Sequence, residues 1–146
     1  MNKKLVVTAL LGSLALSAMA GSLVTVPTTL TDCKSSGPGI TPTCTGQPAN
    51  LSVASALPFT PGDYTFNSAV QPSLSNDGSI SFSYIQNGHR LSLVNSPSSQ
   101  SSAGPKVDVK ATLSAPNSHW EKAAKYMPDD YYCTATSPAG CAFVWQ

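Results

Sequence analysis

The stretch 79–95 constrains the fold of this chain more than any other part of the sequence. Two segments with alternating polar and apolar side chains flank Asn87-Gly88. Asn-Gly in this setting predicts a β-hairpin, because a type I′ turn requires positive φ at both central residues. A two-residue turn also fixes the register, so Phe82 should face Leu93 across the strands. One face of the hairpin is then apolar and consists of Ile80, Phe82, Tyr84, Leu91 and Leu93.

A hairpin of this kind needs further strands or a helix over its apolar face to be stable. The rest of the chain can supply them, since short alternating segments recur between turns rich in Gly, Pro and Ser. Charged residues make up only 10% of the chain, a composition common in exported β proteins and uncommon in helical ones. We therefore predict a mainly β fold, a small antiparallel sandwich or curved sheet with one short C-terminal helix, stapled by disulfides.

The N-terminus has the three parts of a secretory signal peptide. Asn2-Lys3-Lys4 is basic, 5–16 is apolar, and Ala18-Met19-Ala20 offers small residues for cleavage. The sequence thus predicts a signal peptide over 1–20, a single β-rich exported domain over 21–146, and a secreted or periplasmic location. A retained membrane anchor is the alternative, but the apolar run is shorter than a span requires. No later segment could cross a membrane.

The charge balance limits the partners of the exported part. Loss of Lys3 and Lys4 leaves six basic and seven acidic side chains, so the net charge is close to zero. Nucleic acid and other partners recruited by long-range charge are excluded on this ground. A small ligand or a protein is left as the expected partner.

All four cysteines lie in the exported part, and an even number there predicts two disulfides. We favour Cys33 with Cys44 and Cys133 with Cys141, because each pair brackets a turn-rich segment. Pairing of the N-terminal loop with the C-terminal segment is the alternative, and would close longer loops. A metal site is not expected, since the Cys-x2-Cys spacing of a zinc knuckle is missing.

Other segments carry weaker signals. The stretch 22–28 is expected to be a first strand or, equally, a loose N-terminal arm. We expect further strands in 51–57, 64–70 and 106–113, a loop without regular structure over 31–48, and an exposed connection over 96–105. Ser118 with Glu121 forms a capping box, and the apolar side chains from Trp120 recur at helical spacing, which predicts a helix over 118–127. The cysteine-bracketed end, 131–145, predicts a second hairpin.

The densest candidate chemistry lies between His119 and Tyr132. Imidazole and phenolate can ligate haem iron, and aromatic side chains can pack against a porphyrin. The alternative is that the aromatic residues belong to the core and that His119 is merely exposed. A hydrolase site has no Gly-x-Ser-x-Gly elbow to support it, and no catalytic residue is predicted. The speculative ligand-binding residues are His119, Trp120, Tyr126, Tyr131 and Tyr132.

The layout of leader, Ser-rich β segments and aromatic residues near the C-terminus resembles a group of short exported bacterial proteins, some labelled hemin-binding. The resemblance covers size and layout of the whole chain, without a diagnostic motif. It implies haem binding without enzymatic turnover. The leading expectation is an exported, non-catalytic binding or surface-interaction module. Hemin binding is the first alternative, with haem as the possible cofactor, and a small secreted hydrolase is the second.

Overall fold

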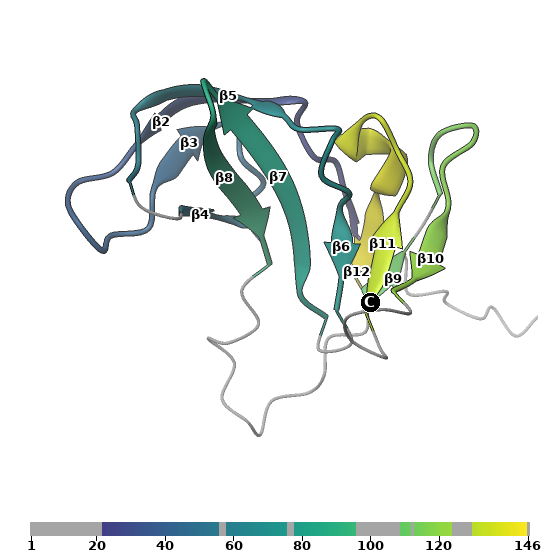
Figure 1. Ribbon diagram of the computed structural model, residues 1–146. Coiled ribbons are helices and arrows are strands. Elements are labelled where there is room, and N and C mark those ends of the chain that lie inside the picture. The colour runs from purple at the N-terminus through teal and green to yellow at the C-terminus, as the bar shows by residue number, and fades with distance from the viewer. Residues whose placement is uncertain are drawn as a thin grey trace, which may run out of the picture.

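The computed structural model describes residues 22–55, 58–75, 78–95, 109–111, 113–123 and 130–145. They form two open antiparallel sheets (Figure 1). The larger sheet contains β2 (Thr29–Lys34), β3 (Thr43–Thr45), β4 (Ser52–Ser55), β5 (Gly62–Phe66), β6 (Ser73–Leu74), β7 (Ile80–Gln86), β8 (His89–Val94), β10 (Trp120–Lys122) and β11 (Tyr131–Cys133). The smaller sheet contains β1 (Ser22–Val24), β9 (Val109–Ala111) and β12 (Phe143–Trp145). The mainly β, antiparallel fold class is confirmed.

The order of strands in the larger sheet is β10-β11-β6-β7-β5-β2-β3, and β8 pairs with both β7 and β4. The sheet curves, with β2, β3 and β4 at one side of the view in Figure 1 and β10 and β11 at the other. In the smaller sheet β12 lies between β1 and β9. Strands β10 and β3 are thus the two ends of the strand order in the larger sheet.

The central hairpin is confirmed as β7 and β8. Asn87 and Gly88 have φ values of 46° and 83°, as a type I′ turn requires. Phe82 lies opposite Leu93 and Tyr84 opposite Leu91. The apolar face is the centre of the core: every one of its five side chains is at most 1% exposed.

Strands on either side of the hairpin complete this core. Leu30 from β2, Val53 from β4 and Tyr64 from β5 are fully buried against it. Burial of a phenol is favourable when its hydroxyl finds a partner, and the Tyr84 hydroxyl donates to the Pro27 carbonyl oxygen at 2.6 Å. This hydrogen bond ties the segment before β2 to the middle of the sheet.

Both disulfides have the favoured local pairing. Cys33 of β2 is bonded to Cys44 of β3, and Cys133 of β11 to Cys141 at the end of the 3₁₀ helix η2 (Pro138–Cys141). The first closes the loop between two neighbouring strands. The second joins the larger sheet to the segment that leads into β12 of the smaller one.

The predicted helix over 118–127 is wrong in its described part. Trp120–Lys122 is strand β10, in which Trp120 pairs with Cys133 and Lys122 with Tyr131. The capping box does not form either, since the Ser118 hydroxyl donates to the carbonyl oxygen of Ala115. Residues 124–129, with Tyr126 among them, lie outside the described residues. The one helix among the described residues is η2.

Two other expectations are corrected. The segment 131–145 is not a hairpin, because β11 pairs with β6 and β10 while β12 pairs with β1 and β9. The stretch 31–48 is not free of regular structure, since it holds the end of β2 and all of β3. The predicted strands are found as β1, β4, β5 and β9. The leader 1–20 and the connection 96–105 lie outside the described residues.

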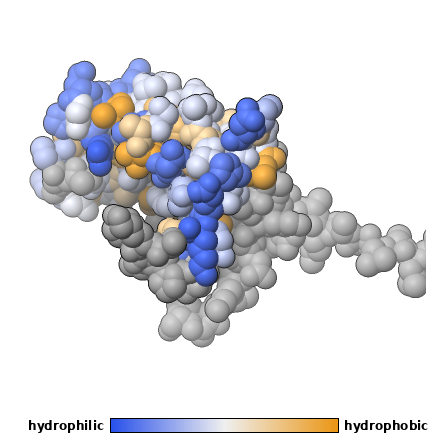
Figure 2. Space-filling model, turned by 45° about the vertical axis from the view of Figure 1, so that its right-hand side comes forward, coloured by the Kyte–Doolittle hydropathy of each residue, from blue (hydrophilic) through white to orange (hydrophobic). Residues whose placement is uncertain are grey.

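On the face seen in Figure 2, most of the described residues are hydrophilic or of intermediate hydropathy, and hydrophobic residues show as separate patches between them. The exposed large apolar side chains in the described ranges are Ile40, Leu113 and Tyr131. No helix within these ranges is long and apolar enough to cross a membrane.

Candidate functional site

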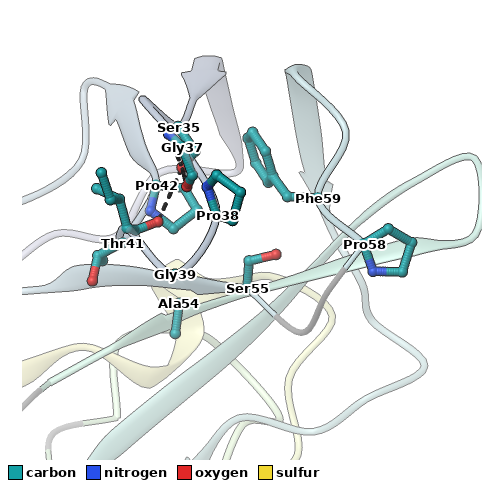
Figure 3. Close-up of a pocket in the computed structure, with 11 residues that line it drawn as sticks. Ser35, Gly37, Pro38, Gly39, Thr41, Pro42, Ala54, Ser55, Pro58 and Phe59 are labelled. Carbon is teal, nitrogen blue, oxygen red and sulfur yellow. Dashed lines mark hydrogen bonds between the residues drawn. The ribbon is translucent and has the colours of Figure 1, made fainter.

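A large hollow lies beside the loop that joins β2 to β3. It has a volume of about 790 Å³ and is drawn in Figure 3. One wall is the loop 35–42, and the other is the end of β4 with the segment that enters β5. The residues that line it are Ser35, Gly37, Pro38, Gly39, Ile40, Thr41, Pro42, Ala54, Ser55, Pro58 and Phe59.

The loop wall is held in place by its own sequence. The Cys33–Cys44 disulfide closes its base. The Ser35 hydroxyl lies 2.9 Å from the Gly37 carbonyl oxygen and 3.0 Å from that of Ile40, and so bridges the loop. Gly39 supplies a turn with φ of 76°. Two prolines restrict φ further. The loop therefore has little conformational entropy to lose if a ligand binds beside it.

The opposite wall is anchored to the core by aromatic packing. The Phe59 ring stacks on Tyr64, with ring centroids 6.4 Å apart and planes 13° from parallel. Tyr64 is itself buried, and its hydroxyl donates to the Thr60 carbonyl oxygen at 2.7 Å. Phe59 points toward the loop that carries Pro38 in Figure 3. Both walls are therefore fixed by contacts outside the hollow.

The chemistry of the lining is apolar with a few hydroxyl groups. Among the lining residues there is no charged side chain, and the polar side chains are those of Ser35, Thr41 and Ser55. Ile40, at the rim, is 52% exposed. Such a lining favours a neutral ligand, because a charged group would lose hydration without gaining a partner.

The residues predicted from the sequence as a ligand site lie elsewhere, around β10 and β11. Successive side chains of a strand point to opposite faces. His119 and Tyr132 therefore share one face, while Trp120 packs against the core on the other. Tyr131 lies on the face of Trp120 and is 36% exposed. The structure thus brings His119 and Tyr132 together and separates them from Trp120.

A polar cluster forms on the face of His119 and Tyr132. The Tyr132 hydroxyl donates to Oε2 of Glu121, and Nε2 of His119 contacts Oε1 of the same carboxylate. The Thr134 hydroxyl lies 2.8 Å from Nδ1 of His119. We call these four side chains the His119 cluster. Glu121 was assigned to a helix cap from the sequence, and Thr134 was not singled out, because the strand pairing that places them is not visible in a local pattern.

The electrostatics of the cluster centre on Glu121. The hydrogen bond from Tyr132, and then the contact with His119, hold the pKa of Glu121 below its usual value. The same hydrogen bond raises the pKa of Tyr132. At neutral pH the carboxylate is therefore ionised and the phenol keeps its proton.

A second hollow of about 430 Å³ adjoins the cluster at Thr134. Its side chains are mostly hydroxyls and amides, among them Gln71, Asn117 and Thr136. The apolar walls that a porphyrin would need lie instead at the β2–β3 loop, near the other end of the strand order. Among the described residues, His119 is thus the possible haem ligand that lies apart from the apolar hollow.

The cluster also differs from a hydrolase triad. In a Ser-His-Asp triad the hydroxyl bonds Nε2 and the carboxylate bonds Nδ1. Here the Thr134 hydroxyl bonds Nδ1 and the Glu121 carboxylate contacts Nε2. The hydrolase alternative gains no support from this exchanged order. Within the described ranges no group of three or more His, Cys, Asp or Glu side chains could hold a metal ion.

No protein-family model, curated protein or solved structure matches this chain. The fold and its sites therefore define the class of the protein: an open antiparallel β protein with two local disulfides. The hollow beside the 35–42 loop was missed by the sequence analysis. The signal that could have found it is the stretch 37–42 within the loop between Cys33 and Cys44, which reads Gly-Pro-Gly-Ile-Thr-Pro and has Thr41 as its one polar side chain.

Proposed function

We propose that this chain is an exported, non-catalytic binding module that takes a neutral, largely apolar small molecule in the hollow between the 35–42 loop and Phe59. The observation that carries the proposal is the pairing of two fixed walls across an uncharged hollow. One wall is closed by the Cys33–Cys44 disulfide, and the other is stacked on buried Tyr64. Haem stays the weaker alternative, because its candidate ligand His119 is not among the residues that line this hollow.

The dimensions and chemistry of the hollow support a small-molecule ligand. Its volume of about 790 Å³ lies within the range of small-ligand pockets, roughly 300 to 1,000 Å³. Pockets in that range are mostly apolar, with a few polar groups that orient the ligand. The lining carries three hydroxyls, those of Ser35, Thr41 and Ser55, and the Ser35 oxygen can still accept from a ligand while it donates within the loop. Fixed walls favour affinity, since little ordering is required on binding.

Export is part of the proposal and is supported by the two disulfides. Such bonds persist in oxidising compartments and are rare in the cytosol. Mass spectrometry of the protein recovered from a secreting host tests this. We expect an N-terminus at Gly21 and two intact disulfides, whereas a full-length chain that starts at Met1 in the cytosol would contradict export.

Ligand binding can be tested with N-phenyl-1-naphthylamine, a neutral apolar dye whose fluorescence increases on leaving water. We expect saturable binding that weakens about fivefold in Ile40→Ser, because roughly 1 kcal/mol of apolar contact is lost when a half-exposed isoleucine is replaced. Leu113→Ser is the matched control. Leu113 is 56% exposed, close to Ile40, but does not line the hollow.

Three results would contradict the proposal. The first is a failure of dye binding to saturate. The second is an equal loss of dye affinity in the two serine variants, which would indicate non-specific contact with exposed apolar side chains. Light scattering supplies the third: if the protein dimerises and Ile40→Ser restores the monomer, the hollow is covered by a second copy and not by a small ligand.

A further inference from the structure

The side chains of the His119 cluster come from two neighbouring strands, and their nitrogen and oxygen atoms converge on one place. His119 and Glu121 are two residues apart and therefore point to the same face. Tyr132 lies directly opposite Glu121 in the register of β10 and β11. Nε2 of His119 and the hydroxyl of Tyr132 each contact one oxygen of the Glu121 carboxylate. An imidazole nitrogen, a carboxylate and a phenol oxygen thus meet at one place.

Thr134 orients the His119 imidazole by a contact with its Nδ1 atom. Its hydroxyl lies 2.8 Å from Nδ1 and 3.4 Å from Nε2, so Nδ1 is the better partner. Its backbone N–H donates to the His119 carbonyl oxygen at 2.9 Å, which fixes the two residues opposite each other. Against the Glu121 carboxylate Nε2 carries the proton and donates it, while Nδ1 accepts from the Thr134 hydroxyl. Because that hydroxyl can also accept, the imidazole can carry its proton on Nδ1 instead and keep the same partner, which leaves a lone pair on Nε2 for a cation. Histidines that bind metals are oriented in this way by a partner of the other nitrogen.

We propose that His119, Glu121 and Tyr132 form a binding site for a divalent transition-metal ion, Cu²⁺ in particular, with Thr134 as the positioning residue. A cation there would take the place of the two protons that Nε2 of His119 and the Tyr132 hydroxyl share with the Glu121 carboxylate. Mixed nitrogen and oxygen donors without a thiolate suit Cu²⁺, which also binds most tightly among the first-row divalent ions. His119 is 53% exposed and Glu121 42%, so water can complete the coordination. When the phenol oxygen binds the ion, its proton passes to solvent.

This site is independent of the apolar hollow. None of the four cluster residues lines that hollow, and β10 and β3 are the two ends of the strand order in the larger sheet. The proposed ion would therefore bind at one end while the small molecule binds near the other. Failure of one proposal leaves the other standing.

The test is a titration of the purified full chain with copper(II) sulfate, followed by visible absorption, electron paramagnetic resonance and calorimetry. We expect one tight site, a phenolate-to-copper charge-transfer band, and coupling to a single imidazole nitrogen. Each ligand has a matched control in the same chain. His89 is the only other histidine, and Tyr131 is the neighbouring tyrosine on the opposite face. Circular dichroism shows whether each variant is folded.

The outcomes separate this site from adventitious binding. Tyr132→Phe should abolish the charge-transfer band and Tyr131→Phe should preserve it. His119→Gln should weaken binding at least about tenfold, while His89→Gln leaves it unchanged. Thr134→Val should keep the band but weaken binding about tenfold, as loss of a supporting partner does elsewhere. Absence of the band, or equal effects of the two histidine variants, would overturn the proposal.

Discussion

Removal of the Cys33–Cys44 disulfide should lower both the stability of the protein and its affinity for an apolar dye. The bond links residues 11 positions apart. In the chain-entropy model a closed loop of this length destabilises the unfolded chain by about 2.8 kcal/mol. The Cys33→Ala/Cys44→Ala variant also loses the constraint on the 35–42 loop, which forms one wall of the hollow. We expect dye binding to weaken at least about tenfold, since the loop must then be ordered on binding.

The second disulfide provides the control. Cys133 and Cys141 are 8 positions apart, and the same model gives about 2.5 kcal/mol for their bond. Both of these cysteines are 0% exposed, so Cys133→Ala/Cys141→Ala also loses packing and should be destabilised at least as much. The Cys133→Ala/Cys141→Ala variant leaves the 35–42 loop, which is one wall of the hollow, unchanged. Urea unfolding measures the two stability losses, and N-phenyl-1-naphthylamine titration in water measures the two affinities.

A selective loss of dye affinity in the Cys33/Cys44 variant would locate the binding site. Equal weakening in both variants would refute the reasoning, because it would mean that affinity follows global stability. Unchanged affinity in both would show that the loop holds its shape without the bond. In that case the Ser35 bridge and the prolines would be sufficient to fix the wall.

Three further predictions concern the sheet, each measured by urea unfolding. Phe82→Ala removes a fully buried side chain from the central hairpin and should cost about 3 to 5 kcal/mol. Burial raises the pKa of Tyr84, so above about pH 10 the unfolded chain loses this proton while the folded chain keeps it, and stability should fall. Tyr84→Phe should cost about 1 to 3 kcal/mol at neutral pH by leaving a backbone carbonyl unpaired, but should reduce the alkaline loss. Gly88→Ala should cost about 1 to 2 kcal/mol from its φ of 83° alone, since nothing lies within 4 Å of the added Cβ. Gly62→Ala should also be destabilising, because Gly62 has a φ of 133° and the added Cβ would displace the Gln86 amide group from the Pro61 carbonyl oxygen.

The parts of the fold that were predictable are those fixed by neighbours in sequence. Asn87-Gly88 determines its own turn, and the turn sets the register of the strands on both sides, so a local pattern was sufficient. Both disulfides close short turn-rich loops, and proximity along the chain selected the correct pairing. The mainly β fold followed from the same short-range signals.

The parts that were not predictable depend on partners far along the chain. The segment at Trp120 is compatible with helical spacing, but its residues also alternate between the two faces of a strand, and a window this short does not decide between them. Pairing with β11 decides it, and β11 in turn pairs with β6, more than 50 positions away. The same pairing brings Glu121 to Tyr132. Because the segment was predicted to be a helix, the His119 cluster was not predicted.

The last prediction follows from the separation of the two proposed sites. Two ligands influence each other only if each binds one conformation of the protein better than another. The hollow and the His119 cluster share no residue, and β7 with its fully buried core side chains lies between β10 and β3 in the strand order. Calorimetric titration with the dye should therefore give the same affinity with and without saturating Cu²⁺, within about twofold. A larger change in dye affinity would mean that the sheet has two conformations in equilibrium, and that each ligand binds one of them better than the other.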